Sequence, residues 1–174
     1  MSVEIRRVAS DEWAEVKALR LRALADEIAH LAFLDTLEHA SAQPDEFWQE
    51  RTRNAASGDQ AAQFVAIAED GAWFGSATVL DHRDHPGSGL VVGVYVADGH
   101  RGAGAIEALF GAAASWARQT GRTALYLEVH VDNHRAQRAY ERCGFVRTGE
   151  ITQLDNGEEY VMVRALGAAD SVGA

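Results

Sequence analysis

Cysteine, proline and uninterrupted apolar sequence are all scarce in this chain, and each shortage excludes a class of protein. Cys143 is the only cysteine, which excludes an internal disulfide and a multi-cysteine metal site. We expect it to be a packing residue rather than a nucleophile. No apolar run approaches the length of a membrane span, and the N-terminal residues lack the charged-then-apolar order of a signal peptide. We therefore expect a cytoplasmic protein with no membrane partner.

Basic side chains are also few relative to acidic ones. The chain has 16 Lys and Arg residues against 26 Asp and Glu residues, which gives a net charge of −10. This charge disfavours binding to nucleic acid or to an anionic membrane surface. It would attract an amine or a polyamine by long-range steering, or it could simply keep the protein soluble, and both interpretations stay open.

With two prolines and no internal repeat or low-complexity linker, the 174 residues are expected to form one domain over residues 1–174. Its core should span about 3–166, with a flexible tail over 167–174. Strands are expected at residues 3–8, 90–96, 123–129, 145–151 and 158–166, with a hairpin over 64–80. Helices are expected from an N-cap at Ser10 to about residue 25, from Pro44 to about residue 57, over about 102–119 and over 134–142. Residues 26–43 are expected to be part helix and part loop. This mixture predicts an α+β domain with a mixed sheet.

A glycine-rich loop separates the strand at 90–96 from the helix that follows it. Gly99, Gly102 and Gly104 fall within six positions. Unpaired backbone N–H groups and the positive end of the helix dipole meet at such a loop, which makes it a candidate anion site. Arg101 and His100 could add positive charge. A tight turn that binds nothing would explain the same glycines.

The loop does not fit the two best-known phosphate-binding motifs. A P-loop requires a Gly-Lys pair, which the chain lacks, and a dinucleotide fingerprint requires a third glycine where this chain has Glu107. By itself, the loop predicts only that an anion binds.

A second segment, about thirty residues later, makes the interpretation more specific. A strand over 123–129 leads to Asn133, Ala136, Tyr140, Gly144 and Phe145 at fixed spacing. Together with residues 94–106, this segment resembles the GNAT superfamily of acetyl-CoA-dependent N-acetyltransferases, and the order of elements from residue 5 to residue 164 also fits. The resemblance implies a twisted, mostly antiparallel mixed sheet of about six to seven strands, splayed at the cofactor site and flanked by about four helices.

The resemblance also implies where acetyl-CoA binds. The loop would hold the pyrophosphate, and the end of the strand at 94–96 would offer main-chain groups to the pantetheine arm and the thioester oxygen. The implied cofactor-binding residues are Val94, Tyr95, Val96, Arg101, Gly102, Ala103, Gly104, Ala105, Ile106, Glu107, Asn133 and Ala136. Asp98 replaces the usual proline and Ile106 a small residue, but the contacts at Ile106 come from the backbone. No metal is expected.

Two residues match catalytic positions of the family. Tyr140 matches the general acid that protonates the departing thiolate, and a core tyrosine is the alternative. Glu128 matches a base in some members, and a glutamate that only positions substrate is the alternative. His130 lies two residues further along the same strand and therefore shares the face of Glu128, so it is a substitute base. A water molecule is the remaining option.

The acceptor is poorly defined by the sequence. The wall for it should span about residues 24–48, with Phe33, Asp35, Glu38, His39 and Trp48 as candidates. Acids beside aromatics would suit a cationic amine, and ordinary packing would explain the same residues. His82 and His85 lie in a polar loop without the context of a zinc site.

The resemblance therefore predicts an acyltransferase that moves acetyl to a primary amine by direct attack. The amine belongs to a small molecule, peptide or protein that remains unidentified. Another acyl-CoA-dependent transferase and a non-catalytic acyl-CoA-binding regulatory module are the alternatives. A homodimer through the C-terminal strands is left open.

Overall fold

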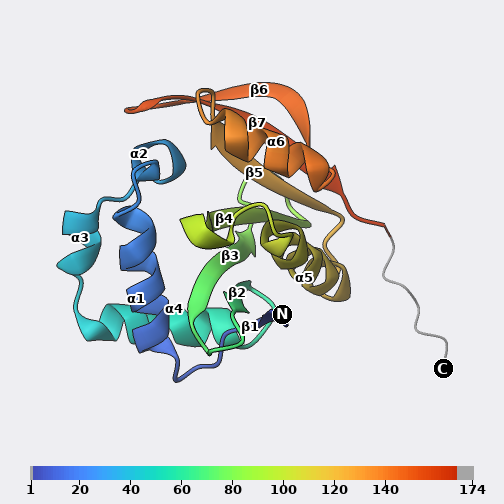
Figure 1. Ribbon diagram of the computed structural model, residues 1–174. Coiled ribbons are helices and arrows are strands. Elements are labelled where there is room, and N and C mark those ends of the chain that lie inside the picture. Colours follow the sequence, from blue (N-terminus) through green and yellow to red (C-terminus); the bar gives the residue numbers. More distant parts are fainter. Residues whose placement is uncertain (1, 168–174) are drawn as a thin grey trace, which may run out of the picture.

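Seven strands form one sheet in the order β1-β2-β3-β4-β5-β7-β6 in a computed structural model, which describes residues 2–167 (Figure 1). The strands are β1 (Glu4–Arg7), β2 (Ala61–Ile67), β3 (Trp73–Asp81), β4 (Ser88–Val96), β5 (Ala124–His130), β6 (Val146–Leu154) and β7 (Gly157–Ala165). Only β4 and β5 pair in parallel; the other neighbours are antiparallel. The expected α+β fold with a mixed, mostly antiparallel sheet is confirmed.

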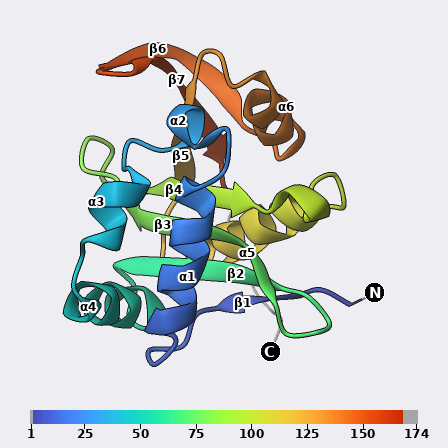
Figure 2. The same cartoon turned by 60° about the vertical axis from the view of Figure 1, so that its left-hand side comes forward.

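Six α-helices and one short 3₁₀ helix accompany the sheet within the described residues, rather than about four helices. They are α1 (Trp13–Leu24), α2 (Ala29–Ala32), α3 (Leu37–Ser41), α4 (Asp45–Ala56), η1 (Asp98–His100), α5 (Ala105–Gln119) and α6 (His134–Arg142). The two additional helices, α2 and α3, lie in the segment expected to be part helix and part loop. Figures 1 and 2 show α1 to α4 gathered on one side of the sheet and α5 on the other.

Two expected helix starts are wrong. Ser10 does not cap α1: the helix begins at Trp13, and the preceding Glu12 instead accepts hydrogen bonds from the Ala9 N–H and from Arg6. The helix expected from about residue 102 begins at Ala105. Gly102 and Gly104 have φ angles of +80° and +85°, which a right-handed helix does not accommodate.

Both faces of the central strands are buried, which explains why β2 is a nearly continuous apolar run rather than an alternating one. Phe64 and Ala66 pack in the cluster that contains the apolar face of α5. Val65 and Ile67 point to the other face, where they pack with residues of α1 and α4. The sheet therefore separates the helices into two layers.

Among residues 2–167, the helices are too short or too polar to cross a bilayer. The tail expected at 167–174 lies, apart from Gly167, outside the described residues.

Candidate active site

The glycine loop has the backbone shape of an anion cradle. Gly104 is the residue that precedes α5, and its left-handed φ of +85° turns the chain from the loop into the helix. A Cβ on Gly102 or Gly104 would meet no heavy atom within 4 Å, so the left-handed backbone and not crowding explains the glycines. The N–H groups of the first turn of α5 lack helical acceptors and are available to a ligand.

The adjoining strand β4 is separated from β5 at this end. The parallel pairing of β4 with β5 covers only Ser88–Leu90, so Val94, Tyr95 and Val96 have no β5 neighbour. A register shift between β3 and β4 and a left-handed Gly93 (φ +62°) bend β4 just before this point. The expected splay of the sheet is confirmed. The register shift beside it was not predicted from the sequence.

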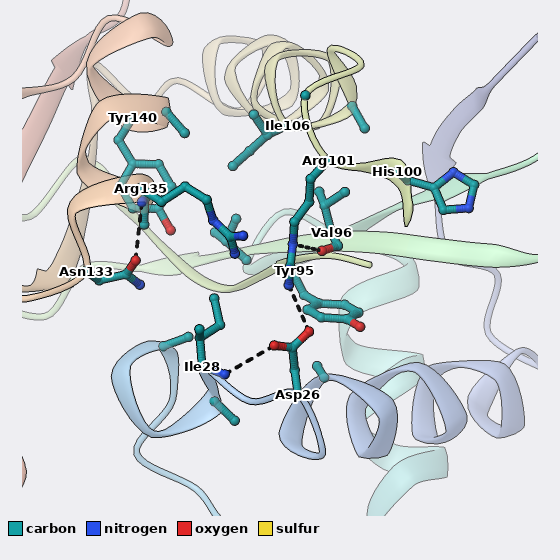
Figure 3. A pocket seen from close by; sticks show the side chains of 18 of the residues that line it. Asp26, Ile28, Tyr95, Val96, His100, Arg101, Ile106, Asn133, Arg135 and Tyr140 are labelled. Atoms are coloured by element: carbon teal, nitrogen blue, oxygen red, sulfur yellow. Dashed lines mark hydrogen bonds and ion pairs between the residues drawn. The ribbon is translucent and has the colours of Figure 1, made fainter. Parts of the chain in front are cut away.

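A pocket lies against the loop and the splayed strand, and it measures about 770 Å³ when the open space at its mouth is included (Figure 3). Its walls also include one face of α6, from Arg135 to Tyr140, and the segment from the end of α1 to Phe33. The expected cofactor residues on the pocket are Val94, Tyr95, Val96, Arg101, Gly102, Gly104, Ala105, Ile106, Glu107, Asn133 and Ala136, and only Ala103 of that set is not among the lining residues.

Arg101 does not point toward the glycine loop. Its Nε donates to the Val96 carbonyl at 2.8 Å, and one Nη donates to Asp26 at 2.8 Å across the pocket. Burial opposes ionisation of Asp26, but hydrogen bonds from Ile28 N–H and Arg101, together with nearby positive charge, lower its pKa. His100 stacks on Phe74 with ring centroids 4.0 Å apart. The expected local charge from Arg101 is therefore already balanced by Asp26.

Asn133 and Tyr140 place α6 against the pocket. The Asn133 side chain accepts from the Ala136 N–H at 3.3 Å and so caps the helix. Tyr140 is buried beside Phe110, with ring centroids 5.6 Å apart, and it lines the pocket. Burial raises the pKa of Tyr140, with smaller contributions from Cys143 and Glu159, so its phenol is protonated at neutral pH.

Glu128 and His130 lie outside the pocket lining. Glu128 is exposed on β5 and accepts from the Thr152 hydroxyl at 3.2 Å. His130 is 4% exposed, and both ring nitrogens are engaged: Nε2 lies 3.0 Å from the Asn156 carbonyl, to which it donates, and Nδ1 accepts from the Asp132 N–H. His130 is therefore unsuited to the role of substitute base.

Glu159 is a candidate functional residue that the sequence did not reveal. It faces His130 across the β5–β7 ladder, on the same face as Glu128. Burial, the charge of Glu128 and a hydrogen bond with Glu128 raise the pKa of Glu159 to about 7. Two carboxylates that lie close together on neighbouring strands repel each other's charge, which raises the pKa of one of them. Glu159 could have been found from the sequence only if the pairing of β7 with β5 had been predicted.

Most of the residues expected to contact the acceptor, and the two loop histidines, interact with other side chains of the protein or lie away from the pocket. Of the expected acceptor residues, Phe33 lines the pocket, Asp35 is bound by His39, and Glu38 is exposed. Trp48 is 1% exposed and does not reach this pocket. His82 and His85 cluster with Tyr126, and the described part of the chain contains no group of three or more metal-ligating side chains.

Solved structures of similar shape cover nearly the whole chain. A GNAT acetyltransferase from Streptococcus pneumoniae has 21% identity and a TM-score of 0.79 over 95% of this chain and 100% of its own. Spermidine N-acetyltransferase from Vibrio cholerae, solved with CoA and spermine, has 16% identity and a TM-score of 0.72 over 94% and 95%. The ribosomal-protein-S18-alanine N-acetyltransferase from Escherichia coli has 14% identity and a TM-score of 0.67 over 99% of both chains.

The family comparison is based on sequence. No curated protein sequence matches the chain significantly. The model of the acetyltransferase (GNAT) family matches residues 25–145, which is more than two thirds of the chain and includes the glycine loop, the splayed strand, α6 and the turn that follows it to Phe145. The chain therefore belongs to the GNAT family of acetyltransferases and is an acyltransferase.

Proposed function

We propose that the protein transfers the acetyl group of acetyl-CoA to a primary amine by direct attack. One observation carries this proposal: the glycine loop, the splayed end of β4 and the phenol of Tyr140 all line a single pocket. A phosphate site, a strand edge and a proton donor are the parts that this reaction needs.

The residues of the loop fit the diphosphate of coenzyme A. The free N–H groups at the start of α5 point to a region that no side chain of Gly102 or Gly104 fills. Arg135 lines the same pocket from α6 and supplies positive charge beside the loop. When bound, acetyl-CoA would supply an activated thioester.

The end of β4 would hold the acyl end of the cosubstrate. Val94, Tyr95 and Val96 lack a β5 partner, so main-chain N–H groups on that side are free to bind an amide or a thioester oxygen, whereas the Val96 carbonyl already accepts from Arg101. A backbone N–H at Tyr95 or Val96 would stabilise negative charge on that oxygen, an effect that can be worth roughly 3–4 kcal/mol in transition-state energy.

Two proton movements complete the proposal. The attacking amine forms the C–N bond and gives up a proton, through a water, to the carboxylate pair of Glu128 and Glu159, which lies outside the pocket lining. The C–S bond breaks, and Tyr140 donates its phenolic proton to the sulfur. Tyr140 then recovers a proton from solvent and the carboxylate pair releases to solvent the proton that it took from the amine, so the enzyme returns to its starting state.

Isothermal titration with acetyl-CoA tests the cofactor site. We expect the wild type to bind and Gly102→Glu to lose binding, because the new carboxylate would occupy the phosphate cradle. Gly71→Glu is the matched control, since Gly71 also has a left-handed φ of +86° but lies in the β2–β3 turn away from the pocket. Absence of binding by the wild type would remove the proposal.

Thiol release with a panel of amines then tests the chemistry. Comparing acetyl-CoA with longer acyl-CoA donors, and amines with alcohols, separates this activity from other acyl transfers. Binding without thiol release on any acceptor would favour a regulatory acyl-CoA-binding module. The proposal also includes a cytoplasmic location. A homodimer would use the sheet edge at β6, where Val146 and Ile151 are exposed.

A further inference from the structure

The pocket beside the glycine loop has one wall that lies opposite the groups proposed to bind acetyl-CoA. Figure 3 shows Asp26 and Ile28 on the far side of the pocket from Ile106. This wall, called the α2 wall below, runs from the end of α1 through α2, and its lining residues are Ala23, Asp26, Ile28, Ala29, Ala32 and Phe33. The loop, the end of β4 and Tyr140 would bind the diphosphate, the thioester and the sulfur. Because acetyl has only two carbons, the α2 wall is left for the acceptor amine, a step that rests on the proposed function.

The α2 wall offers hydrocarbon to a ligand and no free negative charge. Five of its six side chains carry no polar atom. The sixth is Asp26, whose carboxylate already accepts from Arg101 at 2.8 Å and from the Ile28 N–H at 3.2 Å. The charge of Arg135 lowers the pKa of Asp26 further. The one acid of this wall is therefore engaged by the protein's own donors.

The other acids of this region do not supply a charge to the wall. Glu107 is the second acid among the lining residues that the structure describes, but it lies at the start of α5 and pairs with Arg142 at 3.5 Å. Asp35 and Glu38, which the sequence placed near the acceptor, are not lining residues. Asp35 is bound by His39 instead. The acids that would recognise a cationic acceptor are thus directed elsewhere.

A positive charge lies behind the wall. The Arg20 guanidinium packs over the ring of Phe33, 4.5 Å from its centroid, so this face of the ring is not open to an ammonium group. Burial and the charge of Arg51 lower the pKa of Arg20, and Asp35 offsets this only in part. The electrostatic surroundings of Phe33 therefore disfavour a second cation.

We propose that the α2 wall selects a primary amine with an uncharged, apolar body and disfavours a polyamine or any other amine with a second positive charge. The hydrocarbon part of the acceptor would lie against Ile28, Ala32 and Phe33, while its amino group reaches the end of β4. Burial of hydrocarbon here stabilises the complex. Burial of a second ammonium group costs its hydration, and the wall has no free acid to compensate. The net charge of −10 therefore does not make the acceptor a polyamine.

Acetyl transfer to a matched pair of amines tests the proposal in the wild type. n-Heptylamine and 1,6-diaminohexane have the same length and the same reacting group, and they differ in a terminal methyl or ammonium group. We expect kcat/KM for thiol release to be roughly tenfold or more higher for heptylamine. The diamine has two reacting ends, which works against the expected preference. Equal values, or a preference for the diamine, would overturn the proposal.

A carboxylate introduced on the wall should remove this preference. Ala32 lines the pocket but is exposed, so Ala32→Asp adds the charge without disturbing the core. We expect kcat/KM to rise for the diamine and to fall for heptylamine. Ala32→Asn controls for size. Leu34→Asp controls for charge, because Leu34 is 66% exposed and does not line the pocket. Both controls should keep the wild-type preference, and a preference unchanged in Ala32→Asp would contradict the proposal.

Variation of the acyl group tests whether the wall serves the donor instead. If it held an acyl chain, hexanoyl-CoA would replace acetyl-CoA without loss of rate, and methylamine would react as well as heptylamine. That pair of results would overturn the assignment of the wall to the acceptor. We expect acetyl-CoA to be preferred and methylamine to be the poorer acceptor.

Calorimetric titration of each amine into the wild type with CoA separates this proposal from the proposed function. Tighter binding of heptylamine than of diaminohexane, without thiol release from acetyl-CoA, would support the apolar wall and count against acetyl transfer. Equal binding of the two amines would overturn the proposal whatever the activity.

Discussion

Arg101 of the glycine loop and Asp26, which follows α1, form an ion pair with 2.8 Å between Nη2 and Oδ2. The pair joins the loop proposed to bind phosphate to the segment that leads into α2 (Figure 3). Asp26 also accepts from the Ile28 N–H at 3.2 Å, so one carboxylate fixes both segments.

Asp26→Ala should destabilise the protein by roughly 2 kcal/mol, because both partners of the ion pair are largely buried and two hydrogen bonds are lost. Asp98→Ala is the control: Asp98 pairs with the same arginine, but its side chain is 90% exposed, so little change is expected. Urea unfolding at pH 7 measures both. Since the folded-state pKa of Asp26 is lowered, the difference from wild type should shrink as the pH falls below about 4. Equal losses in the two variants would contradict this account.

Glu159→Gln should change how stability depends on pH. The pKa of Glu159 is raised to about 7 in the folded state, so the folded protein holds a proton that the unfolded chain releases above about pH 4.5. Stability from this group is therefore complete below that pH and is lost as the pH rises through about 7. The wild type should lose on the order of 1–2 kcal/mol in free energy of unfolding across this window, a value reduced for partial solvation.

The Gln variant should lack this loss, whereas Glu158→Gln, at an exposed neighbour on the same strand, should keep it. Chemical unfolding at several pH values between 4 and 8.5 provides the comparison. Parallel profiles of the wild type and Glu159→Gln over this range would show that Glu159 does not hold the proton.

Sequence patterns predicted the features that depend on residues close together in the chain. They missed those that depend on residues far apart in it. The start of α6 at Asn133 and the hairpin turn at Gly71 depend on neighbouring residues, and both were predicted. The Arg101–Asp26 pair joins positions 75 residues apart, and no local pattern indicates it. Ser10 does not cap α1 because the helix begins only at Trp13. The residue before it is Glu12, whose carboxylate accepts hydrogen bonds from Arg6 and from the Ala9 N–H.

Tyr140→Phe should reduce kcat by about 10²–10³-fold and leave the Kd for acetyl-CoA nearly unchanged, since it removes only the proton donor. Stability should change little, because no hydrogen bond of the Tyr140 hydroxyl is seen within residues 2–167. Tyr126→Phe is the matched control, because Tyr126 stacks on His85 outside the pocket. Thiol release and calorimetry would be measured on the same samples, and full activity of the Phe variant would exclude Tyr140 as the acid.

Gly157→Ala should destabilise the β6–β7 hairpin more than an ordinary glycine substitution. Gly157 has a φ of +128°, and a Cβ there would lie 2.8 Å from His130 Nε2. The imidazole cannot easily move, because it is buried and both nitrogens are hydrogen-bonded. The expected loss is about 2–4 kcal/mol, from backbone strain and overpacking together.

Gly149→Ala separates those two contributions. Gly149 also has a left-handed φ, of +94°, but its Cβ would meet nothing within 4 Å, so only the strain of about 1 kcal/mol should appear. If both variants lose the same free energy of unfolding in urea, the His130 ring moves away from the new Cβ at little cost. A larger loss in Gly157→Ala means that His130 supports the turn, and it explains why a histidine beside Glu128 and Glu159 is structural rather than catalytic.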